Sequence, residues 1–192
     1  MAKISTKAKR AIGQRKVELR ERLWPGITND HIWERSRDGF GSVPRALPLI
    51  ITIMNYLSDK GKPVGGAYLE LFCRLRDEGF ISLNQQEDMA LASGFTGQRY
   101  LHTFRDRLTK LEEMGFISLK EGATNRFGYA LIWNPYHVIR RFYEAGKLPD
   151  RFWNALVFRA SEIGATDLEE DLPRLPGQNA TARKARKGKP CT

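Results

Sequence analysis

The sequence predicts a mainly helical protein with a small antiparallel β-sheet. Apolar residues recur at steps of three and four along several segments, which is the spacing of helices with one buried face. Two short apolar and aromatic runs, 116–119 and 129–133, flank a stretch rich in Gly, Asn and Thr, as in a β-hairpin. With 192 residues, 41% of them hydrophobic, the chain can bury one core and carry flanking segments besides.

The chain begins with a basic arm, for which we predict the boundaries 1–32. Its first 23 residues hold eight Lys or Arg against two Glu. Good helix formers dominate, and Ile12, Leu19 and Leu23 make a thin apolar stripe, so this arm can fold as a helix on the body or on nucleic-acid phosphates. A solvated, frayed terminus is the alternative.

The central domain is expected over residues 33–135. It opens with an irregular stretch, 33–48, that contains both aromatic residues and arginines. The aromatic side chains of such a loop either pack against the core or, together with the arginines, bind a nucleic acid. A helix follows to about Asp59, and a second is predicted over 67–78, closed by Gly79. Both have apolar residues at helical spacing and are expected to build the core.

A short sequence occurs twice in this domain. Residues 79–83 read Gly-Phe-Ile-Ser-Leu, and residues 115–119 repeat them without change. Each copy follows a helical pattern, so a glycine stop and a short strand are predicted at both places. We expect the two strands to be neighbours in one small sheet.

Between the two copies the sequence predicts a pair of helices joined by a tight turn. Asn84 can cap the first helix, with Glu87 reaching back to it, and Gly94 ends it. Thr96 can cap the second helix, predicted over 97–114. The apolar residues of this second helix form one continuous face: Leu101, Phe104, Leu108 and Leu111.

The second helix is expected to lead into a β-hairpin. Gly115 stops the helix and Phe116 can pack back on its last turn, as in a Schellman ending. The hairpin loop, 121–128, carries a basic residue at each edge, Lys120 and Arg126. The strand from Tyr129 to Trp133 returns from it.

Two further helices are predicted within residues 136–165, over 136–146 and 151–163. The latter has more apolar surface than one face needs, which either a twofold partner or packing within the monomer would cover. The remainder, 166–192, is predicted to be an acidic linker followed by a basic disordered tail. Such a tail adds salt-sensitive attraction to phosphates.

The overall charge and the cysteine content limit the class of protein. A formal net charge of +10 points to a polyanion, either nucleic acid or an anionic membrane surface. The longest apolar run, 47–54, is too short to span a bilayer, and no cleavable leader follows the basic start, so no membrane partner is expected. The two cysteines supply neither a disulfide scaffold nor a metal site, and a reducing cytoplasmic location fits.

The helix pair and hairpin resemble the winged helix-turn-helix superfamily of DNA-binding proteins. Ala90 matches the small residue where the helices cross, Gly94 the turn glycine, and the run through Gly115 to Ile117 the usual exit into a wing. The apolar positions Leu101 and Phe104 fall one residue later than in the tightest form of the motif. A weaker similarity to plasmid or mobile-element regulators extends over residues 33–135.

This resemblance implies a mainly α protein with an antiparallel wing, binding double-stranded DNA as a homodimer. The second helix would enter the major groove, where Arg99 can pair with guanine and Gln98 with adenine. Residues implied to contact DNA are, near the helix start, Thr96, Gln98, Arg99, His102 and Thr103; on the flanks, Arg105 and Lys110; and on the wing, Lys120, Asn125 and Arg126.

Two alternatives to transcriptional regulation remain open, and an enzyme is the third class of protein to consider. A replication or partition protein of a plasmid or mobile element would use the same DNA-binding module. A protein-docking module suits the near-neutral motif, since residues 84–126 hold six basic and six acidic side chains. Enzyme activity is not expected, because nucleotide-binding, zinc and nucleophile motifs are missing from the sequence, and no cofactor is predicted.

Overall fold

The chain divides into two compact units, Met1–Ser42 and Val43–Thr192. The computed structural model describes residues 14–15, 17–19, 21–23, 25–26, 42–75, 79–122 and 126–169. In the first unit, the described residues between 14 and 23 are helical and exposed; a helix was one of the two alternatives for this part of the basic arm. The irregular stretch up to Gly41 and the basic tail from 170 onward, both singled out in the sequence, lie outside the described residues.

The second unit begins with two helices that cross closely, α2 (Leu47–Leu57) and α3 (Gly65–Arg74). The side chain of Asn55 in α2 caps α3: its Oδ1 accepts hydrogen bonds from the backbone N–H of Val64 at 2.9 Å and of Gly65 at 2.8 Å. The helix predicted over 67–78 therefore starts two residues earlier, because Asn55 satisfies donors that a helix start leaves open. It ends at Arg74, since Leu75 is extended.

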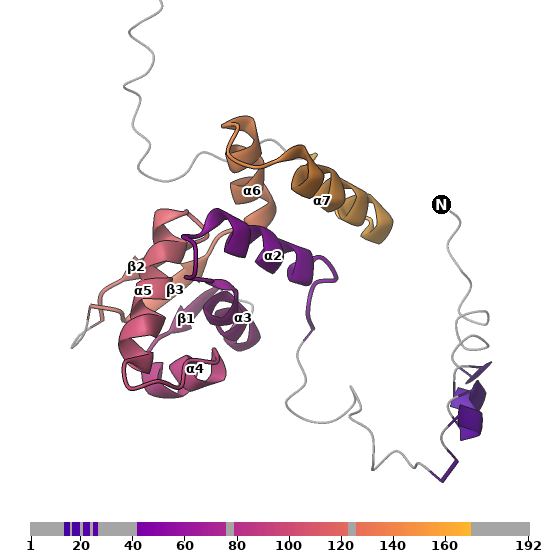
Figure 1. Ribbon diagram of the computed structural model, residues 1–192, viewed down its shortest axis with the longest axis horizontal. Helices are drawn as coiled ribbons and strands as arrows, with labels where there is room; N and C mark the ends of the chain where they lie inside the picture. The colour runs from indigo at the N-terminus through magenta and orange to yellow at the C-terminus, as the bar shows by residue number, and fades with distance from the viewer. Residues whose placement is uncertain are drawn as a thin grey trace, which may run out of the picture. The chain divides into compact units, whose positions relative to one another are not determined.

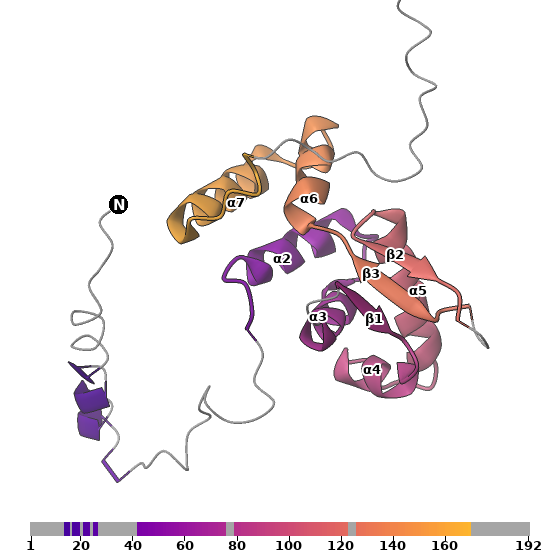
Figure 2. The same ribbon diagram turned by 180° about the vertical axis from the view of Figure 1, so that it is seen from behind.

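Mainly helical structure is combined with one small sheet, as predicted (Figure 1). The sheet has three antiparallel strands in the order β1-β3-β2: β1 (Phe80–Ser82), β2 (Ile117–Lys120) and β3 (Tyr129–Ile132). The two copies of the repeated sequence both contribute a strand to it, but they are not neighbours. β3, the returning strand of the hairpin, lies between them, because β1 and β2 each form hydrogen bonds with it, one on either side (Figure 2).

The predicted helix pair between β1 and β2 is present, as α4 (Gln86–Ala92) and α5 (Tyr100–Glu113). Both predicted capping residues are wrong. The N-cap positions are Gln85 for α4 and Arg99 for α5, and neither cap residue makes a side-chain hydrogen bond to its helix. Because the chain turns at Gly97 before α5 begins, the helix predicted over 97–114 starts three residues later, at Tyr100.

Both helices end on the predicted glycines. After α4, Gly94 has φ +86°, a conformation that residues with a Cβ rarely adopt, and the N–H of Phe95 donates to the carbonyl of Ala90 at 3.1 Å. After α5, the N–H of Phe116 donates to the carbonyl of Leu111 at 2.9 Å, which is the predicted Schellman ending. The two turns fix the directions in which the chain enters α5 and leaves it.

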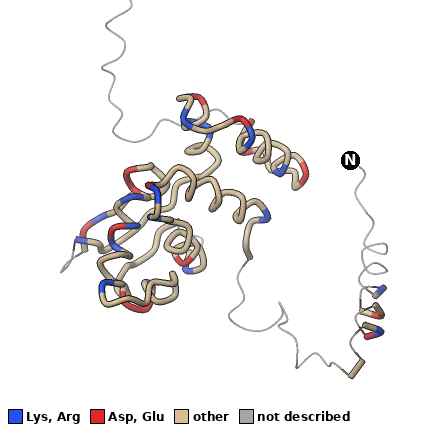
Figure 3. Tube along the Cα trace, in the orientation of Figure 1, with Lys and Arg blue, Asp and Glu red and all other residues tan. Residues whose placement is uncertain are grey.

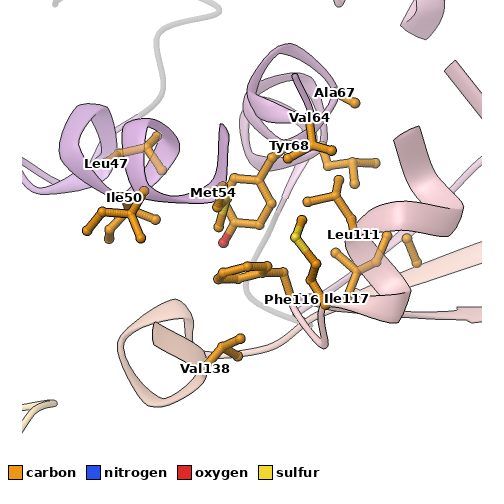
Figure 4. Close-up of a cluster of buried hydrophobic side chains, with 14 of the residues drawn as sticks. Leu47, Ile50, Met54, Val64, Ala67, Tyr68, Leu111, Phe116, Ile117 and Val138 are labelled. Atoms are coloured by element: carbon orange, nitrogen blue, oxygen red, sulfur yellow. The ribbon is translucent and has the colours of Figure 1, made fainter. Parts of the chain in front are cut away.

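One apolar core connects the helices with the sheet (Figure 4). The inner face of α5 provides Phe104, Leu108 and Leu111, each with no exposed surface, as the periodicity predicted. Leu101, the first residue of the predicted apolar face, is instead only half-buried and lines a surface hollow beside α4. Tyr68 of α3 packs edge-on against Phe116, with ring centroids 6.3 Å apart. This packing leaves the opposite side of α5 free of the core.

Two C-terminal helices complete the unit, α6 (Pro135–Glu144) and α7 (Asp150–Ile163). Asn134 caps α6 through a 3.0 Å hydrogen bond from the N–H of Tyr136. In α7, Leu156 and Ala160 are buried within the monomer, whereas Phe158 is 73% exposed. Each helix that the structure describes is too short or too polar to cross a membrane.

Candidate nucleic-acid interface

The turn from α4 into α5 forms an exposed, hollowed tip. Residues 94–100 and Thr103 line a hollow of about 540 Å³ there. Thr96, Gln98, Arg99 and His102 are exposed and Thr103 is half-buried, so the predicted base-reading residues lie together on this surface. Gln98 and Arg99 stand in the turn before the helix, which the N–H of Tyr100 closes by donating to the carbonyl of Gly97 at 2.9 Å.

Arg99 occupies the N-cap position of α5. Its carbonyl accepts the first intrahelical hydrogen bond, from the N–H of Thr103 at 2.8 Å, so its backbone is fixed. Among the residues that the structure describes, no carboxylate forms an ion pair with its guanidinium. An exposed, unpaired guanidinium on a fixed backbone is suited to bidentate contacts with a guanine edge or a phosphate.

His102 lies in the first turn of α5 and faces Asp106. Its Nδ1 is 3.0 Å from a carboxylate oxygen of Asp106, and both side chains are more than half exposed. The pair is ionic only when the imidazole is protonated. An acidic side chain therefore borders the predicted reading surface directly.

Arg105 and Gln86 connect α5 to the base of the hairpin. The Nε of Arg105 donates to Oε1 of Gln86 at 2.8 Å, and Nε2 of Gln86 donates to the carbonyl of Phe127 at 2.9 Å. Gln86 is only 6% exposed, so its amide is satisfied inside the protein. One side chain thus holds α4, α5 and the returning arm of the hairpin loop together.

Lys110 belongs to a different part of the surface. Its ammonium is 3.0 Å from Asp59, in the loop after α2, and 3.5 Å from Glu113. The hydrogen bond donated by Lys110 and its charge lower the pKa of Asp59, and the same hydrogen bond to Asp59 raises the pKa of Lys110. The predicted phosphate-contacting lysine therefore already has carboxylate partners.

The hairpin loop presents two of its three predicted contact residues. Lys120, at the end of β2, is exposed, and the guanidinium of Arg126 lies 5.9 Å from the ring centre of Phe127. Asn125 lies outside the described residues. At the loop base, a Cβ added to Gly128 would lie 2.2 Å from the backbone nitrogen of Gly122, so only glycine permits this approach of the two arms.

Acidic residues surround this basic surface (Figure 3). Glu87 and Asp88, in the first turn of α4, line a second hollow of about 320 Å³ together with Leu101 and Arg105. On the other end of α5, an oxygen of Glu112 accepts a hydrogen bond from the N–H of Leu119 at 2.6 Å. Within α5 the basic side chains Arg105, Arg107 and Lys110 are matched in number by the acidic side chains Asp106, Glu112 and Glu113, so the helix itself carries no net charge.

Gln86, Asn55 and Gly128 are positioning residues that sequence reasoning did not identify. Their partners are on other elements, and nothing in the local pattern distinguishes buried Gln86 from its exposed neighbour Gln85. Within the described part of the chain, no three His, Cys, Asp or Glu side chains gather as they would around a metal ion. Comparisons of the chain with protein-family models, with curated proteins and with solved structures give no match, so its function has to be inferred from these residues and their geometry.

Proposed function

We propose that this chain is a sequence-specific double-stranded DNA-binding protein with a winged helix-turn-helix, acting in the cytoplasm as a transcriptional regulator. In this proposal α4 and α5 are the helix-turn-helix, α5 enters the major groove, and the hairpin between β2 and β3 is the wing. The mainly helical fold with a small antiparallel sheet is compatible with this architecture.

The observation that carries the proposal is the exposed tip at the start of α5. A glycine with positive φ joins two helices, and Gln98 and Arg99 project from the turn that follows it. Their amide and guanidinium are the groups that pair bidentately with adenine and guanine. The buried face of α5 leaves its other side available to a groove.

The other basic residues have supporting roles in this proposal. Lys120 and Arg126 contact the backbone or minor groove beside the main site, because both are exposed on the hairpin that directly follows α5. Arg105 couples α5 to the wing through Gln86. Lys110 contributes little to phosphate binding, since Asp59 and Glu113 already neutralise it.

A homodimer is part of the proposal. The exposed apolar residues Val157 and Phe158 on α7 are available to a second copy, and a twofold pair presents two tips to successive major grooves. Leu156 and Ala160 are already buried in the monomer, so the dimer requires only the outer face of α7.

Fluorescence anisotropy tests the function directly. Full-length protein is first used to select preferred duplexes from a random pool, and the selected and scrambled duplexes are then titrated at two salt concentrations. A regulator prefers the selected duplex by about 10³-fold or more, while its affinity for scrambled DNA falls steeply with salt. Equal affinity for both duplexes would reject sequence-specific recognition.

A protein-docking module is the second candidate, and the acidic residues of α5 favour it. Asp106, Glu112 and Glu113 occupy the exposed side of the helix, where they repel phosphates. Absence of duplex binding even at low salt would support this candidate. A replication or partition protein would behave like a regulator in the binding assay and differ in the location of its preferred site.

A further inference from the structure

A cavity of about 640 Å³ lies on the part of the unit formed by α2, α3 and the ends of α6 and α7. Leu47, Ile50 and Phe72 give it a mainly apolar wall, and Trp133 closes it beside β3. None of its lining residues belongs to α4, α5 or β2. The cavity is therefore separate from the proposed DNA-binding surface, and its size is within the range of small-molecule sites.

Tyr68 brings a polar group without a protein partner to the wall of this cavity. The residue is 1% exposed, and its hydroxyl makes no hydrogen bond to any residue that the structure describes. Figure 4 shows its ring extending from α3 between Met54 and Phe116, with the oxygen at the far end. A hydroxyl with no acceptor in the part of the protein that the structure describes, on a residue that lines a cavity, is available to donate a hydrogen bond to a bound molecule.

Arg45 provides a second donor, at the mouth of the cavity. It is exposed, and no described carboxylate forms an ion pair with it. Asp167, which also lines the cavity, is held by a 2.7 Å hydrogen bond from Nδ2 of Asn134. The hydroxyl of Tyr68 and the guanidinium of Arg45 are donors that have no acceptor among the described residues, and both lie beside an apolar wall. Such a site favours a molecule with an apolar body and acceptor oxygens.

We propose that this cavity is a binding site for a small aromatic or aliphatic carboxylate. Its hydrocarbon part packs against Leu47, Ile50 and Phe72, the hydroxyl of Tyr68 donates a hydrogen bond to an acceptor oxygen, and Arg45 pairs with the negative charge. Burial raises the pKa of Tyr68 well above its ordinary value, so the phenol remains a neutral donor across the physiological range. The site does not depend on the proposed DNA-binding function.

The test uses 2-naphthoate and octanoate as probes, with 2-naphthamide as the uncharged counterpart of the aromatic acid. Binding to the ¹⁵N-labelled full-length protein is followed by NMR titration. We expect shifts at the backbone amides of Tyr68, Phe72 and Trp133, and weaker binding of the amide than of the acid. No shift at these amides with either carboxylate at millimolar concentration, in a protein with a dispersed spectrum, would overturn the proposal.

Three variants assign the contacts. Tyr68→Phe should raise the Kd of 2-naphthoate roughly fivefold, the effect of one hydrogen bond, whereas Tyr56→Phe, a matched change of an exposed tyrosine on α2, should leave it unchanged. Arg45→Gln should remove the preference for the acid over the amide, and the control Arg151→Gln should retain it. Leu75→Trp should block the cavity. Unchanged affinity in both Tyr68→Phe and Leu75→Trp would place the probe elsewhere and reject the site.

Discussion

The side chains of Arg105 and Gln86 meet at 2.8 Å, and through Gln86 the helix α5 is tied to the carbonyl of Phe127. Replacing Gln86 by Leu keeps the volume but leaves that carbonyl without its side-chain donor. We expect the free energy of unfolding to fall by about 1–3 kcal/mol, as for other buried polar groups that lose a partner. Chemical denaturation measures the change.

Gln85→Leu is the matched control for this prediction. Gln85 is exposed and accepts a single 3.0 Å hydrogen bond from Arg74, so its loss should cost less than about 0.5 kcal/mol. Equal effects of the two substitutions would show that the connection between α5 and the hairpin contributes nothing to stability.

Arg99→Ala should weaken binding to the selected duplex by roughly 1–3 kcal/mol and relax the base preference at one position. The reason is that its guanidinium is exposed and unpaired among the described residues, on a backbone fixed by α5. Anisotropy titration of the selected duplex and its single-base variants provides the measurement. Arg159→Ala, which removes an exposed arginine of α7, serves as the control. Uniform losses on every duplex would assign Arg99 to the phosphate backbone instead.

Asp59→Asn should remove a pH-dependent part of the stability. Lys110 lowers the pKa of Asp59 below its ordinary value of 3.8, so the pair stabilises the folded protein above that pH, and this contribution disappears as the pH falls through the lowered pKa. The melting temperatures of the native and Asp59→Asn proteins should differ at pH 5 and converge in strong acid.

Lys110→Met provides the control for this pH dependence. In that background the carboxylate of Asp59 has lost the main cause of its lowered pKa, while the weaker effects of Lys62 and Arg107 remain, so Asp59→Asn should change the pH dependence of the melting temperature much less. An undiminished difference without Lys110 would attribute the effect to another group. Because Asp59 is exposed and Lys110 is only half-buried, high salt should also reduce it.

Gly128→Ala should disrupt the base of the hairpin. The added Cβ would lie 2.2 Å from the nitrogen and 2.3 Å from the Cα of Gly122, and backbone atoms cannot swing aside as a flexible side chain can. We expect a loss of about 1–3 kcal/mol in unfolding free energy, the usual cost of forcing extra volume into a packed site. Gly97→Ala, where a Cβ would meet nothing within 4 Å, is the matched substitution and should be tolerated in a denaturation experiment.

Phe158→Asp should convert the proposed dimer into a monomer without unfolding it. Phe158 is 73% exposed, so a charge there costs the monomer little but would be buried without a partner in a twofold contact through α7. Light scattering after size-exclusion chromatography measures the mass, and Gln85→Glu, which adds a negative charge at an exposed position outside α7, is the control. A native protein that is already monomeric at high concentration would contradict the dimer.

The helices and their glycine endings were predictable because they depend on local sequence. The spacing of Phe104, Leu108 and Leu111 identifies the buried face of α5 without knowledge of its partner, since helical periodicity alone places them on one side. Gly94 and Gly115 end helices because the backbone conformation required there favours a residue without a Cβ.

Helix starts were less predictable, because the groups that satisfy them need not be local. Asn84 and Thr96 have the right chemistry for caps, yet neither caps a helix. Asn55, which does cap α3, comes from another helix and is ten residues away from Gly65. A cap is defined by the position of its oxygen, and the sequence gives only its identity.

By itself, the sequence determined the class of fold, the inner face of α5 and the strands on either side of the hairpin loop, because periodicity and glycine stops act over a few residues. Only the tertiary structure decided which charges are available. It paired Lys110 with Asp59, placed Gln86 between α5 and the hairpin, and left Arg99 exposed in a turn. These outcomes depend on contacts between residues far apart in the chain, and a one-dimensional pattern does not contain those distances.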